Sequence, residues 1–133
     1  AHVDALKRIV SQAKKLIRLD DMSASRTLSG NFHFTVVEAA KNSTLARVYK
    51  VAVNSFPDWM LYQAMFEHPD ELEQSVKEEY KEHLAIAEAI EARNADLAEQ
   101  CAEEHIREIG SQLVAYLGVP QELLDRKMIQ LGL

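Results

Sequence analysis

Apolar residues recur at helical spacing along almost the whole chain, and this period is the strongest constraint on its fold. Between residues 3 and 19, Val3, Leu6, Val10, Ala13 and Ile17 trace one stripe at intervals of three or four residues. No stretch alternates apolar and polar residues in the way of a half-buried strand. The pattern predicts an all-α fold, an antiparallel bundle of six to seven helices joined by short turns.

Breaks in the pattern divide the chain into its expected helices. Asp20-Asp21 ends the first helix, and a second runs from near Ser23 to about Lys41. Asn42 and Asn94 are good N-cap residues for two later helices. The remaining helices are expected at 42–54, at 70–93, at 94–117 and after Pro120, with a short segment at 59–66 between the helices at 42–54 and 70–93. In the helix at 42–54 the residues expected to face inward are Leu45, Val48, Tyr49 and Ala52.

Bulk composition excludes several classes of protein. The chain has 133 residues, which suits one domain, and its net charge of −6 does not favour a nucleic-acid-binding surface. Its single cysteine, Cys101, cannot form an internal disulfide, which is typical of a reducing cytoplasm. No apolar run approaches the roughly 20 residues of a membrane span, and no signal peptide is visible.

Three histidines occupy the middle of three apolar stripes on separate expected helices: His33, His83 and His105. Neutral imidazoles buried together compete for few hydrogen-bond partners, and any that become charged repel one another. A divalent metal, zinc or nickel, resolves both problems by using one lone pair from each ring. The alternative is three separate core histidines, each bonded to a carbonyl group or to water.

Two segments resemble the signatures of one protein family. The stretch LSGNFHFTVVEAAKNSTL (28–45) resembles the first signature of the FCD domain, and EHLAIAEAIEARNADLAEQCAEEHI (82–106) resembles its second. The FCD domain is the C-terminal effector domain of FadR-type regulators within the GntR family. The spacing of the three histidines also fits that family.

The resemblance implies a function in transcription regulation. Its expected features are a helical bundle that binds a small organic-acid effector, a homodimer, and an N-terminal winged helix-turn-helix domain that binds operator DNA. That domain, and the family's usual first helix, do not match anything in residues 1–133, so DNA binding belongs to a part outside them. No enzymatic role is implied.

Many family members hold a metal with one aspartate and three histidines, and His33, His83 and His105 match the three histidines. The aspartate position is Ser29, whose neutral hydroxyl is a poor ligand, so metal binding stays open. Glu79 and Cys101 lie one turn before His83 and His105 and could compensate. The alternatives are a solvated Glu79 and a Cys101 that is a small buried apolar residue.

Further residues are candidates for contact with the effector. Arg26 could pair with a carboxylate or be exposed, and Gln112 is a polar position beyond His105 on the same stripe. The aromatic and methionine-rich segment could cover the cavity or pack in the core; its residues are Trp59, Tyr62, Met65 and Phe66. Two other functions stay open: a metal-dependent hydrolase with a three-histidine site, and a helical scaffold with structural histidines.

Overall fold

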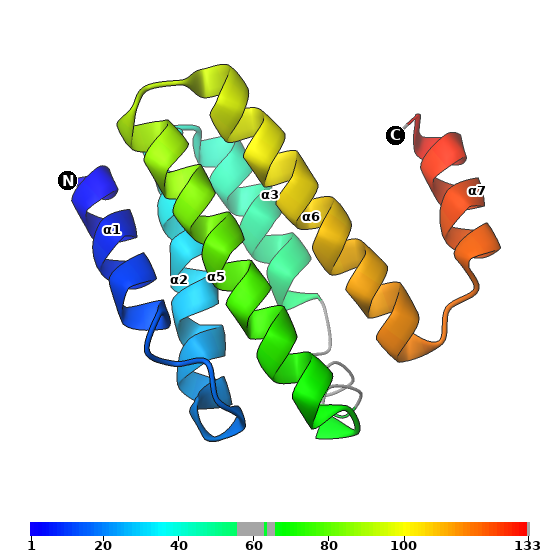
Figure 1. Cartoon of the computed structure of the whole chain (residues 1–133). Coiled ribbons are helices and arrows are strands. Elements are labelled where there is room, and N and C mark those ends of the chain that lie inside the picture. Colours follow the sequence, from blue (N-terminus) through cyan, green and yellow to red (C-terminus); the bar gives the residue numbers. More distant parts are fainter. Residues whose placement is uncertain (56–62, 64–65, 133) are drawn as a thin grey trace.

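The computed structural model describes residues 1–55, 63 and 66–132. Every regular element among them is helical (Figure 1), which confirms the predicted all-α fold. In chain order the elements are α1 (His2–Ala13), the 3₁₀ helix η1 (Leu19–Asp21), α2 (Met22–Ala39), α3 (Ser43–Asn54), α5 (Pro69–Glu91), α6 (Ala95–Leu117) and α7 (Gln121–Leu131).

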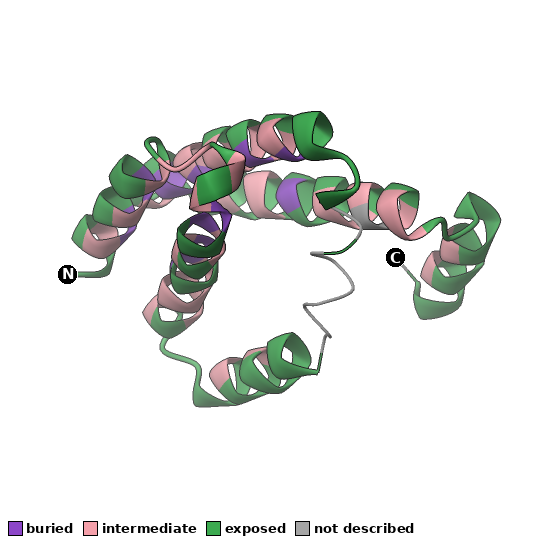
Figure 2. Cartoon of the chain, turned by 90° about the horizontal axis from the view of Figure 1, so that it is seen from below, coloured by how far each residue is buried: buried purple, intermediate pink, exposed green. Residues whose placement is uncertain are grey.

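The core lies where α1, α2 and α5 pack together. Leu6 and Val10 of α1 meet Phe32 of α2 and Ile86 and Ala87 of α5 in one buried cluster. Buried residues accordingly face one another across these helices, and outward faces are exposed (Figure 2). The helical stripes predicted for α1 and α5 therefore form the core.

A tight turn makes α5 and α6 an antiparallel pair, which the figure shows as two long neighbouring helices (Figure 1). Arg93 adopts a left-handed conformation with φ of 55°. The side chain of Asn94 then accepts a hydrogen bond of 3.1 Å from the backbone N–H of Leu97, as predicted for an N-cap. The turn sets the register that brings His83 and His105 to the same level of the bundle.

The first helix is shorter than predicted. It ends at Ala13 rather than Leu19 because the chain there turns back toward α5. Ile17 and Leu19 pack against a second core cluster formed by Met22, Leu72 and Val76. The backbone N–H of Leu19 also donates a hydrogen bond of 3.2 Å to the Glu73 carboxylate. Apolar spacing continued past the helix end because the connection itself is packed.

The predicted inward stripe of α3 is wrong. Asn42 caps this helix as expected, with its side chain accepting hydrogen bonds from the N–H groups of Thr44 and Leu45. However, Val48 is 60% exposed and Leu45 is 44% exposed. Within the described part of the chain α3 packs mainly on α2, so most of its apolar face has no helix against it.

The figures also show α7 standing apart from the bundle (Figures 1 and 2).

Two remaining expectations concern the aromatic segment at 59–66 and a membrane-spanning helix. Trp59, Tyr62 and Met65, the proposed cover of the cavity, lie outside the described residues, while Phe66 is 52% exposed. Among the described residues, no helix combines the length and apolar character needed to cross a membrane.

Candidate metal centre

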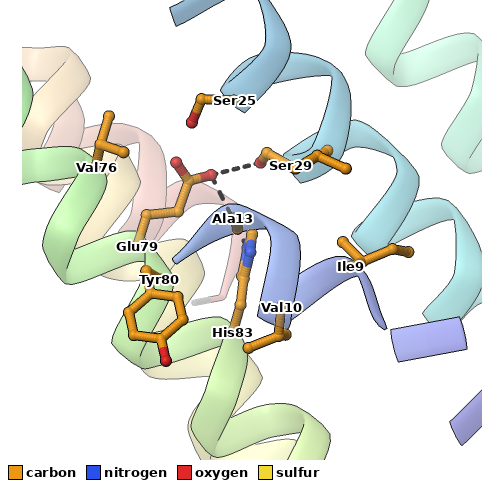
Figure 3. A pocket seen from close by; sticks show the side chains of 10 residues that line it. Ile9, Val10, Ala13, Ser25, Ser29, Val76, Glu79, Tyr80 and His83 are labelled. Atoms are coloured by element: carbon orange, nitrogen blue, oxygen red, sulfur yellow. Dashed lines mark hydrogen bonds and ion pairs between the residues drawn. The ribbon is translucent and has the colours of Figure 1, made fainter. Parts of the chain in front are cut away.

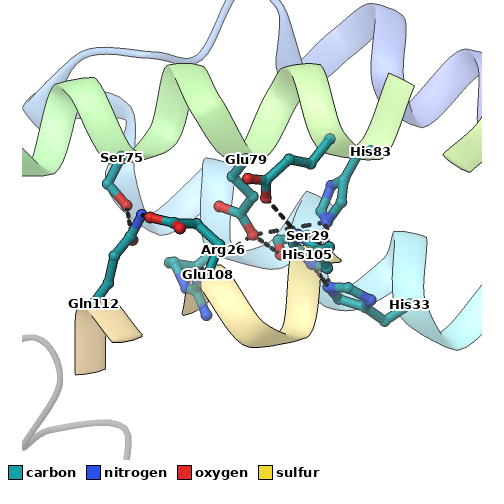
Figure 4. Close-up of polar contacts among 10 residues, drawn as sticks. Arg26, Ser29, His33, Ser75, Glu79, His83, His105, Glu108 and Gln112 are labelled. Carbon is teal, nitrogen blue, oxygen red and sulfur yellow. Dashed lines mark hydrogen bonds and ion pairs between the residues drawn. The ribbon is translucent and has the colours of Figure 1, made fainter. Parts of the chain in front are cut away.

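Three imidazole rings from three helices meet inside the bundle. His33 comes from α2, His83 from α5 and His105 from α6 (Figure 4). The Nε2 atom of His83 lies 3.2 Å from that of His33 and 3.2 Å from that of His105, and the third side of the triangle measures 3.3 Å. His83 and His105 are buried, and His33 is partly buried.

Neighbouring side chains fix two of these rings. Phe32, which is fully buried, stacks on His83 with ring centroids 4.1 Å apart and planes 12° apart. On His105, Nδ1 lies 2.6 Å from Oε2 of Glu82. Because a carboxylate only accepts hydrogen bonds, Nδ1 of His105 carries a hydrogen and donates a hydrogen bond to Glu82. In the neutral ring, Nε2 of His105 then presents its lone pair to the other two histidines.

The environment keeps the other two rings uncharged at neutral pH. Burial, followed by the repulsion of His105 and Arg26, lowers the pKa of His33 to about 4. Burial, followed by the repulsion of His33, His105 and Arg26, lowers the pKa of His83 to about 2. Neutral imidazole is the form that binds a metal, so these two residues need no deprotonation before binding at pH 7.

The triangle has the dimensions that one metal ion requires. Two nitrogens bound at 2.0–2.1 Å to a tetrahedral zinc lie about 3.3–3.4 Å apart. Nitrogens at right angles on an octahedral ion with similar bonds lie about 3.0 Å apart. The observed separations of 3.2–3.3 Å fall between these values. The hydrogen bond from His105 to Glu82 is also typical of a ligating histidine. The donor set therefore fits a divalent ion.

A polar group of three residues borders the histidines (Figure 4). The hydroxyl of Ser29 donates a short hydrogen bond to Oε1 of Glu79. The same oxygen lies 3.7 Å from a guanidinium nitrogen of Arg26 and 3.9 Å from Nε2 of His83. The side chain of Glu79 is only 13% exposed, so it points into the bundle rather than into solvent. Arg26, one-third exposed, pairs with this carboxylate at the edge of the site.

A small cavity lies between α1, α2 and α5 (Figure 3). Its volume is about 10 Å³, and its lining includes Ser25, Ser29, Glu79 and His83. This is close to the minimum space for one water molecule. In this conformation the cavity can hold a water, but it is much too small for an organic acid.

The remaining predicted site residues lie elsewhere. Cys101 is partly buried and packs against the apolar core cluster, which agrees with its interpretation as a small apolar residue. Gln112 accepts a hydrogen bond of 2.5 Å from Ser75 and donates one of 3.1 Å to Glu108, away from the three rings (Figure 4). Sequence reasoning missed Glu82, although it directly precedes His83 in the second signature.

Comparisons with known proteins agree with this architecture. The family model for the FCD domain matches residues 1–108. No curated protein and no solved structure shows a significant match to the chain.

Proposed function

The chain belongs to the FCD-domain family, the C-terminal effector-binding domains of GntR-family regulators, and from this premise we propose that it senses a small organic acid through a metal centre. The observation that carries the proposal is the convergence of His33, His83 and His105 within 3.3 Å of one another. The matched family is regulatory, so we propose binding and not hydrolysis as the role of this centre.

The metal would be a divalent ion, zinc or nickel, bound through the three Nε2 atoms. Such an ion supplies a Lewis-acid position to which an effector carboxylate can bind. Elemental measurement on the purified protein, together with calorimetric titration after chelator treatment, tests this step. We expect one equivalent of metal per chain in the wild type and less than a tenth of an equivalent in a His33→Ala/His105→Ala variant. A wild type that binds no divalent metal would refute the metal centre.

The effector would be an organic acid bound beside the ion. Because the present cavity is water-sized, the acid must displace neighbouring side chains to enter it. Arg26 is the cation placed to pair with an incoming carboxylate, since it is partly exposed and borders the site. We expect a panel of mono- and dicarboxylic acids to include members that raise the melting temperature of the metal-loaded protein.

A matched pair of arginine variants tests the contact with the acid. Arg26→Gln should abolish the thermal shift given by the acid, whereas Arg47→Gln, an exposed position on α3, should leave it unchanged. Equal responses of the two variants would remove Arg26 from the effector site while leaving the metal centre untouched.

Residues 1–133 would form the sensing and dimerisation part of a cytoplasmic regulator of the FadR subfamily. Operator DNA would be bound by an N-terminal winged helix-turn-helix domain outside these residues, and a two-fold dimer would match a palindromic operator. Sedimentation at tens of micromolar should give the mass of a homodimer. In the full-length regulator, the acid should change operator affinity only when metal is present, because occupancy biases the arrangement of the two domains.

A further inference from the structure

The sequence lacks an acid at position 29, yet the structure holds a carboxylate against that position from another helix. Glu79 lies on α5, one turn before His83, and accepts the hydrogen bond of the Ser29 hydroxyl across to α2. Its Oε1 atom is 3.9 Å from Nε2 of His83. A carboxylate therefore lies beside the histidines although Ser29 cannot provide it.

We propose that Glu79 supplies the carboxylate of the metal centre from α5, with Ser29 as the residue that positions it. This inference rests on the proposed metal site and adds to it a second negative charge, besides that of Glu82 on His105. With the ion in place, Glu79 would act as an outer carboxylate and would accept a hydrogen bond from a water on the ion.

Distances favour a bridging water over a direct bond. Two ligands of one tetrahedral ion lie about 3.3 Å apart, whereas Glu79 and His83 are separated by 3.9 Å. Moreover, the compact group of ligand atoms within 4.8 Å of one another contains the three histidines alone, among the residues that the structure describes. The cavity bordered by Ser29, Glu79 and His83 has room for one water beside the carboxylate and the ring of His83.

Charge also favours this role. Imidazoles bind an ion as neutral ligands and add no negative charge to it, and Arg26 adds a positive charge nearby. Oε1 of Glu79 lies 3.7 Å from Arg26 and 3.9 Å from Nε2 of His83, so its negative charge offsets Arg26 and would also offset an ion bound to His83. Because the site is largely buried, this attraction is weakly screened by solvent.

Calorimetric titration of the metal-free chain with zinc tests the assignment. Glu79→Gln keeps the size of the side chain but removes the charge, and it should weaken zinc binding by about 10–100-fold, as the loss of an outer carboxylate does. Ser29→Ala changes no charge and should weaken binding by a smaller factor, about threefold to tenfold, because Glu79 loses its anchor. Ser29→Thr keeps the hydroxyl and should bind zinc like the wild type.

A neighbouring glutamate provides the control. Glu78 precedes Glu79 on α5, but its side chain is 40% exposed, against 13% for Glu79, and it pairs with Lys81. Glu78→Gln removes the same charge from the same helix and should change zinc affinity by less than about twofold, since exposed charges are screened. An equal loss for Glu78→Gln and Glu79→Gln would reduce the effect to general electrostatics and overturn the proposal.

The double variant Ser29→Asp/Glu79→Gln moves the carboxylate from α5 to α2. It should recover most of the affinity that Glu79→Gln loses, because the acid again borders the histidines. Circular dichroism and melting in chelator identify any variant that fails to fold. If Glu79→Gln does not fold, the zinc affinities of Ser29→Ala, Ser29→Thr and wild type test the role of Glu79 instead.

The outcomes separate this inference from the function on which it rests. If wild type binds zinc, the His33→Ala/His105→Ala variant does not, and Glu79→Gln binds as tightly as wild type, the metal centre stands and the role of Glu79 is wrong. If wild type itself binds no metal, the proposed function fails first.

Discussion

Residue 29 illustrates how one side chain sets the character of a buried site. Ser29 is 7% exposed, and its hydroxyl donates a hydrogen bond to Glu79 rather than to a histidine ring. A carboxylate at the same position would face Glu79 at hydrogen-bond distance. Like charges so close in a buried site are costly unless one is protonated or a cation lies between them.

The change in stability caused by Ser29→Asp should therefore depend on whether metal is present. In chelator it should lower the free energy of unfolding by about 1–3 kcal/mol, because a carboxylate is buried beside Glu79 without a partner. With excess zinc or nickel the loss should shrink or reverse, since the ion neutralises the added charge. Thermal melting of both proteins in both conditions measures this. Equal destabilisation with and without metal would show that position 29 does not face the ion.

Two of the histidines also make the metal-free fold sensitive to acid. His33 and His83 have pKa values of about 4 and about 2 in the folded chain, below the ordinary value of 6.5. Unfolding lets both rings take up protons below pH 6.5, so their contribution to stability is complete above that pH. It is lost as the pH falls from 6.5 toward 4, at about 1.4 kcal/mol per pH unit and per ring.

Urea unfolding in chelator between pH 7 and pH 5 should show this slope. In the variant His33→Asn the slope of the unfolding free energy against pH should fall by about 1.4 kcal/mol per pH unit, the contribution of one proton. One of the two histidines with a lowered pKa is then gone. A variant with the slope of the wild type would mean that His33 does not stay neutral in the folded bundle.

At the scale of helices, the three elements that carry the histidines differ from the two at the periphery. α2 and α5 are tied into the core through α1, and α6 packs along α5. By contrast, α3 packs mainly on α2, and Val48, Val51 and Ile129 of α3 and α7 are exposed. Stability of the site should therefore depend on the first group of helices much more than on the second.

A matched pair of N-cap variants tests this difference. Asn94→Ala removes the cap of α6 and should lower the global free energy of unfolding by about 1 kcal/mol. It should also weaken zinc binding, because α6 carries His105. Asn42→Ala removes the cap of α3 and should mainly speed hydrogen exchange within that helix. Equal losses of global stability would show that α3 folds as one unit with the site.

On the scale of the whole molecule, the metal centre would act as a cross-link between helices distant in sequence. His33, His83 and His105 belong to three helices, so one ion bound to all of them opposes any separation of α2, α5 and α6. An ion that binds only the folded chain stabilises the entire bundle by mass action.

Free zinc at a hundred times its Kd should raise the free energy of unfolding by about 2.7 kcal/mol. For a chain of this length the melting temperature should rise by roughly ten degrees. The variant His33→Ala, which changes the least buried of the three ligands, should still fold and should lose most of this rise. A rise that persists in the variant would place the bound zinc elsewhere.

The sequence alone determined the helical fold and the three histidines. Apolar spacing every three or four residues predicts amphipathic helices, and the histidines in the middle of three such stripes were expected to lie inside the bundle. The caps at Asn42 and Asn94 were predictable because their interactions are local. Such local preferences do not depend on how the helices are arranged.

Which groups surround the rings depends on how the helices pack against one another. Glu79 and Cys101 each precede a histidine by one turn, yet Glu79 borders the site and Cys101 packs in the core. The rotation and register of α5 and α6 against their neighbours decide that Glu79 faces the site and Cys101 does not. The spacing of residues along a helix carries no information about this rotation or register. The exposure of α3 has the same origin, because an apolar stripe is buried only where another helix lies against it.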